Sequence, residues 1–431
     1  MGNMMQGSSF GSMLLAASLA ALGPSAASAE EWTLTTLHSF QGGFDGVFPN
    51  GGLVADASGA LYGTTAGGGE EWPYLYGTVF KLTPPSAGSS DWTEQVLLHL
   101  PGGASGDGPS GGVIFGPAGS LYGLTIAGGT KESGVAYRLY PPAPSIERWH
   151  PSLLYSFVNG DKLRGLLLRG PGNVLYGTAE GRGGTGDTYN YGSVFALVPS
   201  KIAGGGWSLS YLHVFTDKDG DGAAPMTGVI TDASGALYGV TPGGGNGNGI
   251  VFKLTPPTTA GGSWTETVLH TFIGQESKED EDGSQPGGLV MDKSGSLYGT
   301  TSEGGSHNDG VIYRLTPTTT EDSAWGYSIL HDFSGPDGAN PDSALILGAT
   351  GDLYGTTTEG GNSSSGTIFR LTPPANSGGS WTLTVLHAFN GLDGSDPQGP
   401  LLLLHGALYG TTQIGGADPG VGTVFKLTAP P

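Results

Sequence analysis

The sequence of 431 residues contains no cysteine. Disulfide bonds, thiolate metal sites and a cysteine nucleophile are therefore excluded. Charged residues are also scarce: they make up 12% of the chain, and 16 Lys and Arg stand against 37 Asp and Glu, which gives a formal net charge of −21. Because an acidic surface repels the phosphate backbone, we expect no nucleic-acid partner.

Long hydrophobic runs are missing from most of the chain. No segment after residue 29 is apolar for long enough to span a bilayer, so we expect no membrane span. An apolar run from Met13 to Leu22 precedes Ala27-Ser28-Ala29, the small-residue pattern that signal peptidase cuts. We expect a signal peptide at 1–29 and a protein that is secreted, periplasmic or on the cell surface. Residues 1–12 lack the usual basic residue, and a start without a targeting role is the alternative.

Glycine is abundant, with 82 residues, and it recurs at fixed places in a tandem repeat. The tripeptide Leu-Tyr-Gly occurs seven times, and its tyrosines are 60, 54, 62, 60, 56 and 55 residues apart. They are Tyr62, Tyr122, Tyr176, Tyr238, Tyr298, Tyr354 and Tyr409. A period of this length indicates a repeated supersecondary unit.

Each repeat contains four short runs with the alternation of a β-strand, which in the fifth repeat are 287–292, 296–301, 310–316 and 325–333. Helical spacing is absent after residue 29. We therefore predict an all-β fold, a seven-bladed β-propeller of four-stranded antiparallel blades, as a single domain over 30–431. After residue 29, the first strand, 32–40, has the pattern of the fourth run of a repeat, and the last strand, 422–428, has the pattern of the third run. The N-terminal strand should complete the last blade.

The sequence resembles the GloVer-type tandem repeat proteins, which are exported bacterial repeat proteins. The matching text is Gly-Gly-Leu-Val-x-Asp-x-Ser-Gly-x-Leu-Tyr-Gly-Thr-Thr at 51–65 and 287–301, followed by Gly-Thr-Val-Phe-Lys-Leu-Thr at 77–83 and 422–428. The resemblance covers nearly all of the mature chain and implies a β-propeller fold and export. It implies no biochemical activity and adds no catalytic residue.

Most repeated residues have a structural interpretation. Leu and Tyr of the tripeptide should pack between blades, since they lie on opposite faces of an inner strand. Six histidines, one in each of six of the seven repeats, lie on the fourth strand: His38, His99, His213, His270, His331 and His387. Being spread around a ring, they cannot converge on one metal, and we expect each to form hydrogen bonds at the outer edge of its blade. The recurrent Asp-Gly before each new repeat is typical of a turn.

Function is expected where the repeats differ. The loops that join second to third strands and the loops that join blades leave from one face, which we take as the candidate binding surface. Two of these loops carry aromatic residues that could stack on sugars or anchor a protein. They are Trp72, Tyr74 and Tyr76 in the first repeat and Tyr189 and Tyr191 in the third. The alternative is that they fold back over the blade.

The third repeat also concentrates basic residues, namely Lys162, Arg164, Arg169 and Arg182. They could hold an anionic ligand such as a uronate or a phosphate, or they could form local salt bridges only. A separate segment, Asp217-Lys-Asp219-Gly-Asp221-Gly, matches the opening of a calcium loop, although Gly228 stands at the twelfth position, where a glutamate is usual. Calcium is the only cofactor that the sequence suggests.

No pair of carboxylates suitable for glycoside hydrolysis is found on the innermost strands. We therefore expect no catalytic residues, and an exported, monomeric binding or scaffold module for extracellular polysaccharide or a surface protein. The alternative is an enzyme acting on polysaccharide, a hydrolase or lyase, with its site on the same loop-bearing face.

Overall fold

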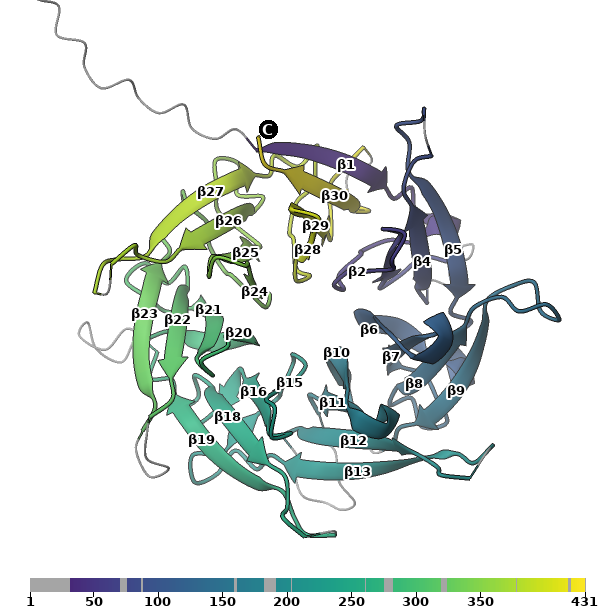
Figure 1. Ribbon diagram of the computed structural model, residues 1–431, viewed down its shortest axis with the longest axis horizontal. Coiled ribbons are helices and arrows are strands. Elements are labelled where there is room, and N and C mark those ends of the chain that lie inside the picture. Colours follow the sequence, from purple (N-terminus) through teal and green to yellow (C-terminus); the bar gives the residue numbers. More distant parts are fainter. Residues whose placement is uncertain are drawn as a thin grey trace, which may run out of the picture.

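Seven four-stranded antiparallel sheets form a closed ring (Figure 1), so the predicted seven-bladed β-propeller is confirmed. The computed structural model describes residues 32–69, 76–86, 88–158, 161–181, 191–202, 204–259, 261–274, 282–318, 324–376, 378–417 and 420–430. The predicted signal peptide, 1–29, lies outside these residues. No helix in the described part is both long enough and apolar enough to cross a membrane.

In blades 1 to 6 the strands run in sequence order from the centre of the ring outward, and in blade 7 the outermost strand is β1. Blade 1 contains β2 (Val54–Ala55), β3 (Leu61–Thr65), β4 (Thr78–Thr83) and β5 (Thr93–His99). Blade 2 contains β6 (Asp107–Phe115), β7 (Leu121–Ala127), β8 (Val135–Tyr140) and β9 (His150–Ser156). Blade 3 contains β10 (Leu163–Arg169), β11 (Leu175–Ala179), β12 (Ser193–Pro199) and β13 (Trp207–Val214).

Blades 4 to 7 repeat this plan. Blade 4 contains β15 (Ile230–Thr231), β16 (Leu237–Thr241), β18 (Ile250–Thr255) and β19 (Thr265–Thr271). Blade 5 contains β20 (Ser284–Met291), β21 (Leu297–Glu303), β22 (Val311–Thr316) and β23 (Gly326–Asp332). Blade 6 contains β24 (Ile346–Leu347), β25 (Leu353–Thr357), β26 (Thr367–Thr372) and β27 (Thr382–Ala388). Blade 7 contains β28 (Leu402–Leu404), β29 (Ala407–Thr412), β30 (Thr423–Thr428) and β1 (Thr33–Ser39).

Short elements lie in the connections. A two-stranded sheet of β14 (Gly222–Ala223) and β17 (Gly243–Gly244) joins two loops of blade 4. Four 3-10 turns are η1 (Gly43–Asp45), η2 (Gly103–Ser105), η3 (Pro117–Gly119) and η4 (Pro171–Asn173).

The ring is closed by pairing of the two ends of the chain, as the sequence predicted. The register runs from Thr33 opposite Thr428 to Ser39 opposite Thr423. Phe40, directly after β1, is fully buried in the cluster shared by blades 7 and 1. The N-terminal strand therefore covers what would otherwise be an open edge of blade 7.

The Leu-Tyr-Gly motif packs the blades against one another, which confirms its structural interpretation. In blade 4, the Tyr238 ring lies 6.3 Å from the ring of Trp325 in the next blade, and its hydroxyl donates a 3.0 Å hydrogen bond to Asp232. Gly239 leaves room for an aromatic ring, because a Cβ there would lie 2.5 Å from Cζ of Phe252. In the described residues, seven hydrophobic clusters each join two neighbouring blades.

One face of the ring carries the loops that join second to third strands together with the loops that join successive blades. We call it the loop face. Isolated bridges tie the two kinds of loop to each other, as between Val47 and Gly67, Ala339 and Glu359, and Ser395 and Ile414. These bridges place both loops of a blade on the same face, as expected, and hold them against each other.

Candidate functional site

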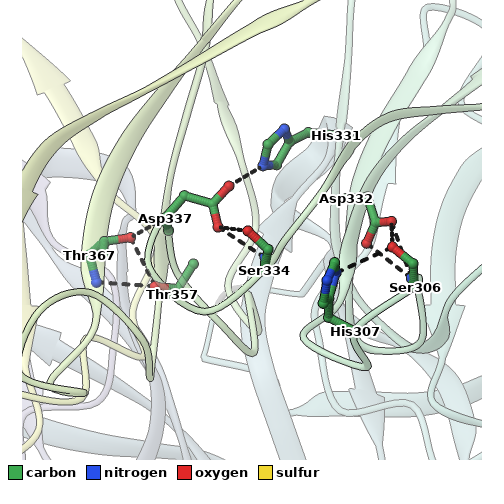
Figure 2. A network of polar contacts seen from close by, with 8 residues as sticks. All are labelled: Ser306, His307, His331, Asp332, Ser334, Asp337, Thr357 and Thr367. Carbon is green, nitrogen blue, oxygen red and sulfur yellow. Dashed lines mark hydrogen bonds and ion pairs between the residues drawn. The ribbon is translucent and has the colours of Figure 1, made fainter.

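A histidine–aspartate pair marks most blade junctions on the loop face. His331 Nε2 lies 2.8 Å from Oδ2 of Asp337, whose other oxygen accepts a 2.9 Å hydrogen bond from the backbone N–H of Ser334 (Figure 2). The equivalent pairs are His38–Asp45, His213–Asp221, His270–Asp282 and His387–Asp393. The sequence suggested separate roles for the histidine and the Asp-Gly turn, but in the structure they form one unit.

His99 departs from this pattern because it stands one residue later on its strand. Leu98 occupies the position opposite Val79, and His99 faces Thr78. Successive residues of a strand point to opposite faces, so the imidazole of His99 is turned away from the junction of blades 1 and 2. It contacts Phe44 instead, with ring centroids 6.2 Å apart.

A second repeated feature of the loop face is a residue in the left-handed conformation before a proline. Five non-glycine residues hold φ between 55° and 59° there, namely Phe48, Ala224, Gln285, Asn340 and Asp396. In blades 1, 6 and 7 the carbonyl of this residue accepts a hydrogen bond of 2.9–3.1 Å from the loop after the second strand, for example from the Thr358 N–H at 3.1 Å. The backbone is therefore fixed while the side chain differs from blade to blade. We call these five residues the pre-proline set.

A pocket of about 280 Å³ opens on the loop face of blades 4, 5 and 6, and two members of the pre-proline set, Gln285 and Asn340, line it. Its wall consists of Met226, Thr227, Pro242, Gln285, Pro286, Ser302, Glu303, Asn340, Asp342 and Thr358. Side-chain amides, hydroxyls and carboxylates alternate there with proline and methionine. This mixture can form hydrogen bonds to a polar ligand and can contact its apolar parts.

Carboxyl groups gather beside this pocket. Burial raises the pKa of Asp396, and the negative charges of Asp342 and Glu359 raise it further. Gln398 donates a 3.2 Å hydrogen bond to Asp396, which acts in the opposite direction. These carboxyl groups stand in the loops outside the innermost strands, the strands on which no carboxylate pair was expected.

A larger hollow of about 570 Å³ lies on the opposite face, between blades 5 and 6. Its wall includes Tyr298, Arg314 and Trp381. Tyrosine and tryptophan stand at the corresponding positions of every repeat, where they pack blade against blade. We therefore regard this hollow as a product of the repeated frame and the loop-face pocket as the blade-specific one.

The structure separates the predicted basic residues. Arg164 donates a 2.8 Å hydrogen bond to Glu180, and the exposed Lys162 is two residues away on the loop face. Arg169 lies at the far end of β10, where it donates a 3.3 Å hydrogen bond to Asn173. Arg182 is outside the described residues. An anion site at Lys162 and Arg164 stays a prediction, and Arg169 is not near it.

The predicted aromatic residues are only partly described, since Trp72, Tyr74 and Tyr189 fall outside the described ranges. Tyr76 is half-buried, and its carbonyl accepts a 3.0 Å hydrogen bond from the Gly108 N–H. Tyr191 is exposed over 37% of its surface, and its carbonyl accepts a hydrogen bond from the Ala224 N–H. Both backbones are thus tied to the loop between blades, and ligand binding by their rings stays a prediction.

The predicted calcium residues take different positions. Asp217 and Asp219 are exposed, with φ of 54° and 56°, whereas Asp221 accepts 2.8 Å hydrogen bonds from the N–H and the hydroxyl of Thr216. Among the described residues, one group offers three metal-ligand atoms within 4.8 Å of one another: His213, Asp221 and Glu266. Asp217 and Asp219 are not part of it, and the calcium site stays a prediction.

The fold and its tandem motif define the class of the molecule, a seven-bladed β-propeller built from repeats of one supersecondary unit. The family model of the Gloeobacter/Verrucomicrobia repeat matches residues 72–281 and 265–431. The chain belongs to this family, as the resemblance in the sequence indicated. Among curated proteins, none matches the sequence.

Several solved structures align with most of the chain at low similarity. A gluconolactonase from Xanthomonas campestris is 12% identical, with a TM-score of 0.40, over 93% of this chain and 90% of that chain. A luciferin-regenerating enzyme is 12% identical, with a TM-score of 0.44, over 92% and 95%. A glucose dehydrogenase is 14% identical, with a TM-score of 0.42, over 74% and 95%. TM-scores below 0.5 say nothing about the activity of this chain.

Proposed function

We propose that this propeller is an exported, non-catalytic binding module that takes extracellular polysaccharide at the loop-face pocket. One observation carries the proposal. On a frame that repeats its core residues seven times, the pre-proline set presents a different side chain in each of five blades, and a pocket opens beside two of them, Gln285 and Asn340. Variable side chains on a rigid scaffold are a common basis of recognition.

The pocket chemistry favours a sugar chain over an apolar ligand. Gln285 and Asn340 each provide an amide donor and acceptor, and Ser302 and Thr358 add hydroxyls. Pro242 offers an apolar surface for the C–H face of a sugar ring. The excess of acidic residues disfavours polyanions, so we expect a neutral polysaccharide or one bearing amino groups.

A glycan array with the chain lacking residues 1–29 tests the proposal. Gln285→Gly and Asn340→Gly remove a pocket side chain, and glycine accepts their left-handed backbone without strain. Each should weaken binding about tenfold, as expected for one lost hydrogen bond to a buried ligand group. Lys293→Ala, an exposed residue in the hairpin turn on the opposite face, is the matched control. Binding to no glycan refutes the proposal and favours a surface protein as the partner.

The second candidate function is cleavage of polysaccharide, either by hydrolysis or by the elimination reaction of a lyase. The observation that favours it is Asp396, whose raised pKa suits a proton donor, with the Asp342 carboxylate near it. Incubation with any polysaccharide that binds, followed by assay of new reducing ends or unsaturated products, decides between the two. If cleavage occurs and Asp396→Asn abolishes it while binding is kept, the protein is an enzyme.

A further inference from the structure

A third side chain joins the histidine–aspartate pair at the junction of blades 3 and 4. Glu266 stands on β19, two residues after Trp264, and its Oε2 lies 3.5 Å from Nε2 of His213 on β13. Asp221 comes from the loop between the two blades, 3.2 Å from the same nitrogen. Three ligand groups from three segments therefore meet at one point.

The position two residues after the tryptophan faces the preceding junction in other blades too. Tyr327, two residues after Trp325, stacks on His270 at 4.2 Å. Leucine stands at this position in blades 6 and 7, as Leu383 and Leu34. At these three junctions the histidine and aspartate lie 2.8–2.9 Å apart, the distance of a direct hydrogen bond. Folding therefore does not require a glutamate here.

The wider spacing around Glu266 has the dimensions of a metal site. Ligand atoms placed tetrahedrally at 2.0–2.2 Å from Zn²⁺ are roughly 3.3–3.6 Å apart. His213 forms a long hydrogen bond of 3.2 Å with Asp221 and lies 3.5 Å from Glu266, and both distances come close to this range. All three ligand atoms lie within 4.8 Å of one another. Imidazole with two carboxylates is a ligand set that suits Zn²⁺ better than Ca²⁺, which takes six to eight oxygens.

Two features of the surroundings point to a bound cation. Oε1 of Glu266 is buried and, among the described residues, has no hydrogen-bond partner. Asp221 is held in place by Thr216 and by the N–H of Gly222, which donates a 2.8 Å hydrogen bond to Oδ1. Such outer contacts orient a metal-binding carboxylate.

We propose that His213, Asp221 and Glu266 bind one divalent transition-metal ion of the Zn²⁺ type, which joins the outer strands of blades 3 and 4. The fourth coordination position is left to water or to a ligand. The junction of blades 7 and 1 has the same residue types in His38, Asp45 and Glu94, with His38 and Asp45 3.5 Å apart. The proposal does not depend on the function proposed above.

Titration of the mature chain, free of added tags, with Co²⁺ tests the site. Tetrahedral Co²⁺ absorbs visible light strongly, and Zn²⁺ should displace it. Glu266→Leu places at this position the residue that Leu34 and Leu383 provide in other blades, so the variant should fold. We expect the wild-type chain to bind one equivalent at this junction and Glu266→Leu to lose it. His331→Ala breaks a pair that has no glutamate and should bind metal as the wild type does.

Melting in the presence of Zn²⁺ gives an independent reading. The metal should raise the melting temperature of the wild type and of His331→Ala but not of Glu266→Leu, because an ion bound to the folded state stabilises it and Glu266→Leu removes one of the three ligands. If a second equivalent of metal binds between blades 7 and 1, the variant Glu94→Leu should lose that equivalent. The proposal is wrong if the wild-type chain binds no Co²⁺, or if Glu266→Leu and the wild type bind the same amount.

Discussion

The hydroxyl of Tyr211 donates a 2.9 Å hydrogen bond to Oδ2 of Asp161, a fully buried aspartate in the turn between blades 2 and 3. Histidine is replaced at this junction by Tyr155, so no cation faces the carboxyl from that position. Burial raises the pKa of Asp161 to about 7, although the hydrogen bond from Tyr211 acts in the opposite direction. This junction therefore responds to pH differently from the junctions with a histidine.

The free energy of unfolding should fall as the pH rises from 5 to 8. The unfolded chain releases the Asp161 proton near pH 4 and the folded chain near 7, so the folded state binds more protons in between. The stability is fully present below the unfolded value and is lost as the pH approaches 7. Urea denaturation should show a loss of about 2 to 3 kcal/mol relative to Asp161→Asn. Equal pH profiles for the two proteins would contradict the buried carboxyl.

Replacing Gly239 by alanine should destabilise the fold by about 1 to 3 kcal/mol, because the new methyl group would overlap Phe252. Chemical denaturation measures the loss. The matched control is Gly206→Ala, since a Cβ at this exposed glycine meets no atom within 4 Å. Equal stabilities of the two variants would show that the ring over the glycine can move aside without cost.

Removal of residues 1–40 should cause the protein to self-associate. The deletion exposes the edge of β30, whose backbone groups β1 otherwise pairs, and such an edge can pair with another chain. Size-exclusion chromatography with light scattering measures the state. Removal of residues 1–31 leaves β1 in place and should give a monomer. If the chain that lacks residues 1–40 is also monomeric and folded, β1 is dispensable for closure of the ring.

Calcium should raise the melting temperature of the wild-type chain if Asp217 and Asp219 complete an ion site, as their spacing predicts. Asp219→Asn should remove this increase while Zn²⁺ binding at His213 is kept. Differential scanning fluorimetry with Ca²⁺ and with the calcium-selective chelator EGTA measures both effects. Unchanged melting on addition of EGTA would refute the calcium prediction.

The repeated frame could be predicted from the sequence because each blade uses the same local patterns. Leu-Tyr-Gly marks the second strand of every blade. The N-terminal strand, which has no repeat of its own, indicated that the ring is closed by pairing of the two ends of the chain. The pairing of His331 with Asp337 could not be deduced, because it depends on the path of the intervening turn. An Asp-Gly pair follows each of the six strand histidines, and this regularity could have suggested the histidine–aspartate pairing.

The candidate site was harder to find for a related reason. A residue before proline is known to avoid the right-handed helical region, but its left-handed conformation in Gln285 and Asn340 follows from loop packing and not from local sequence. The grouping of Glu266 with His213 joins strands of two blades and requires the geometry of their junction. Trp72 and Tyr189 stand out in the sequence because their loops are long, whereas Gln285, Asn340 and Glu266 lie in segments of ordinary length.

The seam between β1 and β30 also sets how the molecule should respond to mechanical force. Thr33 and Thr428, at the two ends of the chain, face each other at the same end of the antiparallel ladder. Tension applied between the termini would therefore load the hydrogen bonds one after another, as in unzipping, and would not load them all together in shear. A chain held by both ends would open at this seam under low force, before any other blade is disturbed.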